Sequence, residues 1–208
     1  MKEKEEKKAN HGLSRRGFLK GAGLTTAGTV VANSGLLAFN TKFGPARGES
    51  FGPDAVRVSI NVNGRVQDII CEPRTTLASA LRDHMGLTGT KVVCDRGSCS
   101  ACTVWVDGEP VNSCMTLAMD VVDKKVTTIE GIAKNGELHP IQEAFIEHDA
   151  SQCGYCTPGM IMSCTHLLEN NPAPTLEDVK KATRGNLCRC GTHPHVFKAT
   201  LDAAKKMK

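Results

Sequence analysis

The fold of this chain is decided at residues 94–102, which read Cys94-Asp95-Arg96-Gly97-Ser98-Cys99-Ser100-Ala101-Cys102. Three cysteines stand here in the spacing C-x4-C-x2-C, and Cys114 follows further along. This spacing suits a 2Fe-2S cluster, and small residues around Gly97 allow amide N–H groups to point at its sulfurs. Zinc is the weaker alternative, because zinc sites favour two C-x2–4-C pairs.

A second set of four cysteines lies further along, with Cys153 and Cys156 followed by Cys188 and Cys190. Each pair stands just before a predicted helix, so the positive ends of two helix dipoles would converge on an anionic cluster. We predict a second 2Fe-2S centre here, and the local spacing leaves zinc open as an alternative. Two one-electron centres in one small chain indicate an electron relay.

Around the first set, the sequence predicts strands and one short helix. Asn63-Gly64 and Asp107-Gly108 are turn dipeptides between alternating strands. Thr75 or Thr76 can cap a helix that carries Leu77, Ala80, Leu81 and Met85 and ends at Gly86. The predicted strands are Val56–Asn61, Val66–Cys71, Thr103–Val106, Glu109–Ser113 and Val126–Ile129. The order of these elements resembles the β-grasp of plant-type ferredoxins, over residues 55–132.

The C-terminal part, residues 136–207, predicts four helices. Thr157-Pro158 should cap and begin the second, Thr175 should cap the third, and His193-Pro194 should open the fourth. The side chains expected to face inward are Ile141, Ala144, Phe145, His148, Met160, Ile161, Cys164, Leu167, Leu168, Leu176, Val179, Phe197, Leu201 and Ala204. We therefore expect an α+β protein, with a helical 2Fe-2S domain after the ferredoxin-like one.

Residues 1–50 have the order of a twin-arginine signal peptide and linker. Ser14-Arg15-Arg16-Gly17-Phe18-Leu19-Lys20 follows a charged start and precedes a mildly apolar stretch. This predicts export of the folded protein to the periplasm. A chain that is folded and metallated before export has already committed its thiolates, which disfavours a disulfide framework.

The composition and the distribution of charge argue against some classes of function. The chain has 208 residues and a formal net charge of +4. Residues 1–48 hold nine Lys/Arg and three Glu, whereas the remainder holds 17 Lys/Arg and 19 Asp/Glu. The positive charge therefore belongs to the leader, and no basic stripe predicts nucleic-acid binding. The sequence has no apolar run of membrane-spanning length, so a stable membrane span is not expected. Its single Trp and single Tyr predict a mainly aliphatic core.

Three motifs together resemble a known family. They are the stretch Cys94 to Val104, the stretch Gln152-Cys153-Gly154-Tyr155-Cys156-Thr157-Pro158-Gly159-Met160, and Gly185-Asn186-Leu187-Cys188-Arg189-Cys190. In this order they are similar to the small iron–sulfur subunit of the molybdenum hydroxylases, the xanthine dehydrogenase and aldehyde oxidoreductase family. The resemblance spans residues 56–201.

The resemblance implies a ferredoxin-like domain followed by a four-helix bundle, and two 2Fe-2S clusters. It implies that the second cluster lies nearest a molybdopterin cofactor in a separate large subunit. The first cluster would pass electrons to a flavin subunit or another acceptor, such as a c-type cytochrome. By resemblance, Gln152 and Cys190 contact the pterin, and Cys190 is also a cluster ligand. Substrate oxidation, of an aldehyde or N-heterocycle, would occur in the partner, so no catalytic residue is expected in this chain.

The chain departs from the family pattern at two places. Ser100 stands where the family usually has Gly, so its side chain is expected to adjust the loop. Gly191-Thr192-His193-Pro194 replaces the commoner Thr-Gly-Tyr and is more similar to the isoquinoline-oxidoreductase-like branch. This departure leaves the substrate and the flavin subunit open, and export favours a cytochrome or another local acceptor over NAD.

Several side chains and functions remain as alternatives. Cys71 and Cys164 are expected to be buried thiols without a cluster, while His193 and His195 are expected to be cap or interface residues. No cysteine of the two four-cysteine sets has a histidine two residues later, so a Rieske centre is not expected. The rival functions are a free-standing exported electron carrier and a zinc- or disulfide-stabilised binding protein.

Overall fold

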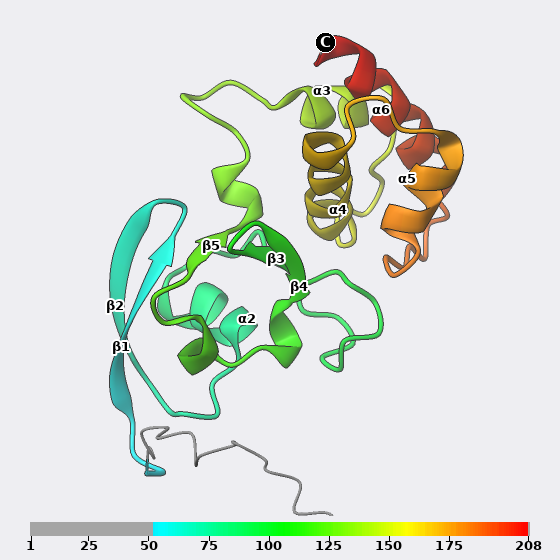
Figure 1. The fold of residues 1–208 in the computed structure, drawn as a ribbon. Helices are drawn as coiled ribbons and strands as arrows, with labels where there is room; N and C mark the ends of the chain where they lie inside the picture. The colour runs from blue at the N-terminus through cyan, green and yellow to red at the C-terminus, as the bar shows by residue number, and fades with distance from the viewer. Residues whose placement is uncertain (1–51, 208) are drawn as a thin grey trace, which may run out of the picture. The chain divides into compact units, whose positions relative to one another are not determined.

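A five-stranded mixed sheet forms the first part of the molecule in this computed structural model, which describes residues 52–207 (Figure 1). β1 runs parallel to β5, and the other neighbouring pairs are antiparallel. The strands, in the sheet order β2-β1-β5-β3-β4, are β1 Val56–Val62, β2 Arg65–Cys71, β3 Thr103–Val106, β4 Glu109–Asn112 and β5 Lys125–Thr127.

Both predicted hairpins are confirmed, and the turn residues explain them. Asn63 and Gly64 have φ values of +52° and +78°, and Asp107 and Gly108 have +51° and +87°. Two successive left-handed residues form the turn type that matches the twist of a hairpin. The last predicted strand is shorter than expected, because the chain turns into a 3-10 helix at Ile129–Gly131.

The short helix lies where the sequence predicts it, but with a different geometry. Only α2, Leu77–Ser79, is α-helical, and Ala80–His84 form a π-helical turn. The Thr76 hydroxyl caps the start by accepting from the Ser79 amide at 3.2 Å. The wider turn leaves both Leu77 and Leu81 fully buried.

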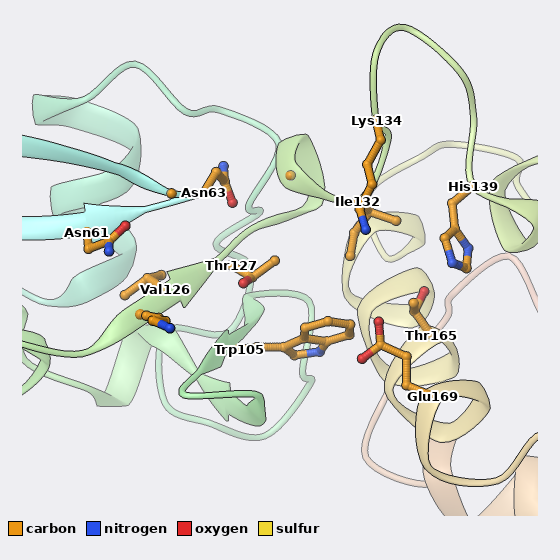
Figure 2. Close-up of a pocket in the computed structure, with 13 residues that line it drawn as sticks. Asn61, Asn63, Trp105, Val126, Thr127, Ile132, Lys134, His139, Thr165 and Glu169 are labelled. Carbon is orange, nitrogen blue, oxygen red and sulfur yellow. The ribbon is translucent and has the colours of Figure 1, made fainter.

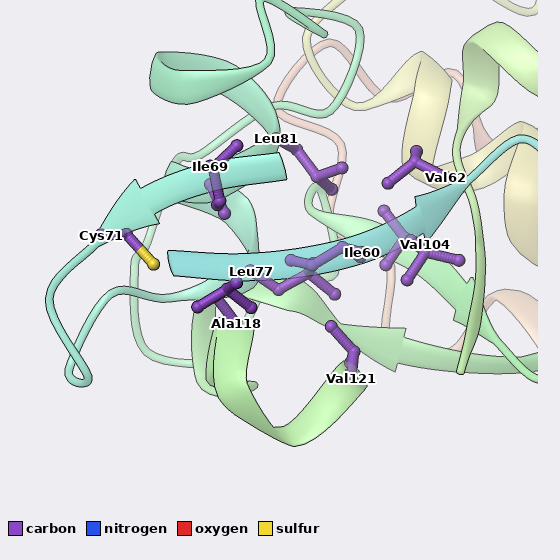
Figure 3. Close-up of a cluster of buried hydrophobic side chains, with 12 residues drawn as sticks. Ile60, Val62, Ile69, Cys71, Leu77, Leu81, Val104, Ala118 and Val121 are labelled. Atoms are coloured by element: carbon purple, nitrogen blue, oxygen red, sulfur yellow. The ribbon is translucent and has the colours of Figure 1, made fainter. Parts of the chain in front are cut away.

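The core beneath the sheet is aliphatic, as the composition predicts. Figure 3 shows side chains from β1, β2, α2 and the 3-10 turn Ala118–Val121 meeting in one cluster. Cys71 is a free thiol at its edge, 2% exposed, so its expected burial is confirmed. The described part of the cluster is built from Val, Ile, Leu, Ala and Cys, without an aromatic ring.

The second part of the molecule holds the four predicted helices. They are α3 Pro140–Glu147, α4 Thr157–Asn170, α5 Leu176–Thr183 and α6 His193–Lys206. Thr175 caps α5 in a reciprocal capping box with Asp178, as its position predicts. At α4 the expected cap was wrong by one residue, since Cys156 is the N-cap and Thr157 begins the helix.

The inward faces of α5 and α6 differ in part from the prediction. Leu176 of α5 is 44% exposed, and Phe197 and Leu201 of α6 are only half-buried. Among the apolar residues of α6, Val196, Ala199 and Ala203 are fully buried instead, and Ala204 is buried as predicted. They share a face at helical spacing and join a cluster with buried residues of α3. Small residues at this face let α6 pack closely on α3.

The sheet and the helices belong to one compact unit, Ser50–Lys208. Trp105 of β3 lies between them, and its indole Nε1 donates to the Met162 carbonyl of α4 at 3.1 Å (Figure 2). Within residues 52–207, no helix combines the length and the apolar character needed to cross a bilayer. The predicted twin-arginine segment lies outside the described residues.

Candidate functional site

The first cysteine set is gathered by one curled loop and one later turn. Cys94, Cys99 and Cys102 lie in the loop before β3, and Cys114 lies in the 3-10 turn Ser113–Met115 after β4. The curl depends on left-handed backbone, with φ values of +52° at Asp95, +72° at Gly97 and +52° at Ser100. Ser100 therefore adopts a conformation that glycine would take with less strain.

Within the first set, the side chains interact mainly in two pairs. The pKa of Cys94 responds to the Cys99 side chain, and that of Cys114 to the Cys102 side chain. The Ser98 amide donates to the Cys94 sulfur at 3.3 Å, and the Gly97 amide donates to the Cys114 sulfur. The prediction that loop amides point at the sulfurs is thereby confirmed.

The loop gives the two ends of this set opposite acidities. Hydrogen bonds from the Arg96 amide and from Cys99 lower the pKa of Cys94 to about 7. Burial and the neighbouring Cys102 thiol raise the pKa of Cys114 to about 11. Cys114 keeps its proton at neutral pH until a metal displaces it, so metal binding would release protons.

The second set is assembled from two separate segments at two helix starts. Cys153 and Cys156 immediately precede α4, and Cys188 and Cys190 precede α6, whose N-cap is Thr192. The side chains pair across the segments, Cys156 with Cys188 and Cys153 with Cys190. The structure thus brings together all four predicted cysteines, although the whole of α4 and α5 separates the two pairs along the chain.

Thr192 is a functional residue that the sequence reasoning missed. Its hydroxyl lies 3.1 Å from the Cys188 sulfur, and its amide donates to the same sulfur at 3.5 Å. Burial alone would raise the pKa of Cys188, but these two hydrogen bonds, together with those from Cys156 and the Cys190 amide, lower the pKa to about 6. Burial raises the pKa of the paired Cys156 to about 12. The position of Thr192 at the start of α6, shortly after Cys188, was the available signal.

The geometry of both sets fits a 2Fe-2S cluster better than a zinc ion. Four sulfurs at about 2.3 Å from one zinc ion would lie roughly 3.8 Å from one another. Among the His, Cys, Asp and Glu side chains of residues 52–207, three ligand atoms lie within 4.8 Å of one another only at Glu147, His148 and Asp202. No three sulfurs of either cysteine set are that close together. Two separated pairs of sulfurs instead match a binuclear cluster, in which each iron takes two thiolates.

The two sets are joined through backbone. The Leu187 amide, next to Cys188, donates to the Cys99 carbonyl at 3.1 Å. The Asn186 side-chain amide donates to the Ser100 carbonyl at 3.1 Å. One hydrogen bond therefore links a residue of the first set to the neighbour of a residue in the second.

The second set reaches the surface, whereas most of the first is covered. Cys153 and Cys190 are exposed, as is Gln152. Tyr155 and Leu187 beside them are large apolar side chains with 58% and 60% exposure. Exposed apolar side chains grouped on one surface are typical of a surface that a partner covers.

The two histidines and the buried cysteine that the sequence analysis singled out contact neighbouring parts of the fold. The His193 ring lies 2.9 Å from the Asn186 carbonyl, and the His195 ring 2.8 Å from the His148 carbonyl. Both histidines therefore tie the start of α6 to neighbouring segments of the chain, whereas the N-cap of this helix is Thr192. Cys164 is fully buried, and burial raises the pKa of its thiol to about 12.

A cavity of about 460 Å³ lies between the sheet and α4 (Figure 2). Asn61 and Thr127 line it from the strands, and Thr165 and Glu169 line it from α4. Its lining includes no cysteine among the described residues, so it is separate from both four-cysteine sets.

Comparisons with known proteins agree with this geometry. Residues 60–133 match the family described as a 2Fe-2S iron-sulfur cluster binding domain, and residues 128–201 match the [2Fe-2S] binding domain. The aldehyde oxidoreductase iron-sulfur-binding subunit PaoA of Escherichia coli (strain K12) is 37% identical over 94% of this chain and 90% of its own length. The nicotine 6-hydroxylase small subunit of Paenarthrobacter nicotinovorans is 47% identical over 72% of this chain and 90% of its own length.

Solved structures give the same result. Quinoline 2-oxidoreductase from Pseudomonas putida 86 is 39% identical, with a TM-score of 0.68 over 74% of this chain and 98% of that chain. The aldehyde oxidoreductase from Desulfovibrio gigas is 39% identical, with a TM-score of 0.69 over 73% of this chain and 17% of that chain. With two four-cysteine sets in the matched regions, this chain belongs to the family of iron–sulfur subunits of the molybdenum hydroxylases.

Proposed function

We propose that this chain relays electrons singly between a molybdenum-cofactor subunit and an external acceptor, within an exported hydroxylase. The first cluster would be held by Cys94, Cys99, Cys102 and Cys114, and the second by Cys153, Cys156, Cys188 and Cys190. A 2Fe-2S cluster supplies one-electron redox chemistry when bound. The ferredoxin-like domain would comprise residues 55–132, and the helical domain residues 136–207.

The observation that carries the proposal is the link between the two sets. The Leu187 amide and the Cys99 carbonyl are 3.1 Å apart, so a short covalent path with one hydrogen bond runs from Cys99 to Cys188. The amides of Ser98 and Thr192 donate to one sulfur in each set. Such donors favour the more negative, reduced state and so raise the potential.

The exposed second set supports a direction for the relay. Cys153, Cys190 and Gln152 lie at the surface, with exposed Tyr155 and Leu187 beside them. A large subunit that covers this surface would bring its pterin to Gln152 and Cys190. Electrons would then leave through the first set, where Cys94 is the least buried member.

The substrate would be oxidised in the partner, and an aldehyde or an N-heterocycle is the proposed class. The names of the relatives support it, since they act on aldehydes, nicotine and nicotinate. Export by the twin-arginine route, from the motif at Arg15 and Arg16, favours a c-type cytochrome or a flavin subunit with a local acceptor over NAD.

The deciding experiment is EPR of the dithionite-reduced protein purified from its native host, with iron and molybdenum counted in the same sample. The relay requires two distinct 2Fe-2S signals, about four irons per chain and co-purifying molybdenum. Two signals without molybdenum would favour a free-standing carrier. Zinc in place of iron, with no signal, would reject the proposal.

Export has its own test. Replacing both Arg15 and Arg16 by lysine keeps the positive charge but removes the arginine pair. We expect the variant to stay in the cytoplasm with both clusters assembled, as measured by cell fractionation and EPR. Unchanged delivery to the periplasm would refute the twin-arginine assignment while leaving the relay intact.

A further inference from the structure

The Ser100 carbonyl is the point where the segments carrying the two cysteine sets meet. It accepts hydrogen bonds from the Thr103 hydroxyl at 2.8 Å and from the Asn186 side chain at 3.1 Å. Asn186 is 3% exposed and is fixed through its backbone, because its amide donates to the Thr183 carbonyl at 2.9 Å. Ser100 directly follows Cys99, and Asn186 stands two residues before Cys188.

Gly159 of α4 lies very close to the same carbonyl. A Cβ built on Gly159 would lie 2.3 Å from the Ser100 oxygen and 3.0 Å from the Ala101 oxygen. Both contacts are with backbone, and ordinary van der Waals contact begins at 3.4 Å. Gly159 is needed here for clearance and not for an unusual φ. It lies three residues after Cys156.

We propose that Gly159 and Asn186 are positioning residues that set the spacing between the two clusters. The inference rests on the proposed function, since it concerns clusters held by these eight cysteines. Ser100 is next to Cys99 of the first set. Asn186 and Gly159, which face its carbonyl, lie two and three residues from cysteines of the second set. A shift of this carbonyl against α4 would therefore change the separation of the sets. Electron transfer and magnetic coupling between two centres both weaken with distance.

The main test is Gly159→Ala in the complete enzyme, with the large subunit present. The added methyl must move the loop or the helix, since the clearance falls short of contact by about 1 Å (3.4 against 2.3 Å). We expect an unchanged iron content, a smaller magnetic splitting between the two reduced clusters in EPR, and slower electron equilibration between them after rapid reduction.

A milder variant keeps the proposal testable if the methyl prevents assembly. Asn186→Ala removes the hydrogen bond to the Ser100 carbonyl but retains the backbone bonds of residue 186. We expect a smaller change in splitting and rate, in the same direction. Gly52→Ala is the matched control, since its new Cβ would have nothing within 4 Å, and both readouts should equal those of the unmodified enzyme.

The outcomes separate this inference from the proposed function. Two intact clusters with unchanged splitting and unchanged equilibration rate in both variants would overturn the positioning roles. A change in the g-values of one cluster without a change in splitting would also overturn them, because it would show a local disturbance only. Failure of the unmodified enzyme to show two 2Fe-2S signals would instead reject the relay itself.

Discussion

The two cysteine sets solve the same chemical problem in different ways. Three cysteines of the first set come from one short loop, residues 94–102, and Cys99, Cys102 and Cys114 are at most 8% exposed. The second set joins two segments that are distant in sequence, and Cys153 and Cys190 are exposed. Local loop geometry therefore builds the first site, whereas helix packing builds the second.

This difference indicates which part of the fold supports each site. The first site is covered by its own chain, so its stability should follow that of the sheet and its aliphatic core. The second requires α4 and α6 to be packed correctly, and its exposed cysteines, Cys153 and Cys190, are not covered by this chain. Four perturbations, from the largest expected effect to the smallest, test this contrast.

Removing one ligand from each set should have unequal consequences. Cys102→Ala and Cys190→Ala should each lower the iron content from about four to about two atoms per chain. Cys102 is 2% exposed, so its loss should also lower the melting temperature much more than the loss of exposed Cys190. Iron analysis with calorimetry measures both, and equal destabilisation would contradict the contrast.

Core truncations should act on the nearer site. Leu77→Ala should cost about 2–5 kcal/mol of unfolding free energy and broaden the EPR signal of the first cluster, because Leu77 is fully buried and adjoins Ala78, which packs on Cys102. Met160→Ala is the counterpart in the helical region, where Cys156 packs against the same buried cluster. Identical effects of both variants on both signals would show that the two sites do not respond separately.

Removing a hydrogen bond to sulfur should change one potential only. Thr192→Val deletes the hydroxyl 3.1 Å from the Cys188 sulfur, so the midpoint potential of the second cluster should fall by up to about 60 mV. Redox titration followed by EPR measures the shift. Thr200→Val is the control on the same helix, because the Thr200 hydroxyl donates to the Val196 carbonyl, and it should leave both potentials in place.

The smallest effect concerns the packing of α6 on α3. Hydrogen bonding from His148 lowers the pKa of Asp202, and Lys206 adds to the effect. A carboxyl with a depressed folded-state pKa stabilises the fold above its unfolded pKa, and this contribution is lost as pH falls through the folded value. Asp202→Asn should therefore melt slightly earlier at pH 7 and approach the unmodified protein below about pH 4. A constant difference across this range would argue against the ion pair.

The sequence predicts local features well, because each depends on a few neighbouring residues. Asn63-Gly64 is sufficient for a hairpin, Thr175 with Asp178 for a cap, and C-x4-C-x2-C for a loop that gathers sulfurs. The prediction for the inward face of α6 was partly wrong, since the choice between Phe197 and Ala199 depends on how closely α3 approaches.

Contacts between residues that are distant in the sequence could not be predicted from the sequence. The hydrogen bond from Asn186 to Ser100 joins residues 86 positions apart, and no local sequence pattern predicts it. The close approach of Gly159 to the Ser100 carbonyl is equally hidden, because a glycine near a helix start has many explanations. The pairing of sulfurs within each set also depends on the folded path of the chain.

Trp105 has a practical consequence. It is the only tryptophan of the chain, and its indole donates to the Met162 carbonyl at the seam between the sheet and α4. Its fluorescence therefore reports on that seam alone. Iron–sulfur clusters absorb visible and near-ultraviolet light and would quench this emission, so a rise in intensity during unfolding would time the separation of the sheet from the helices without any added label.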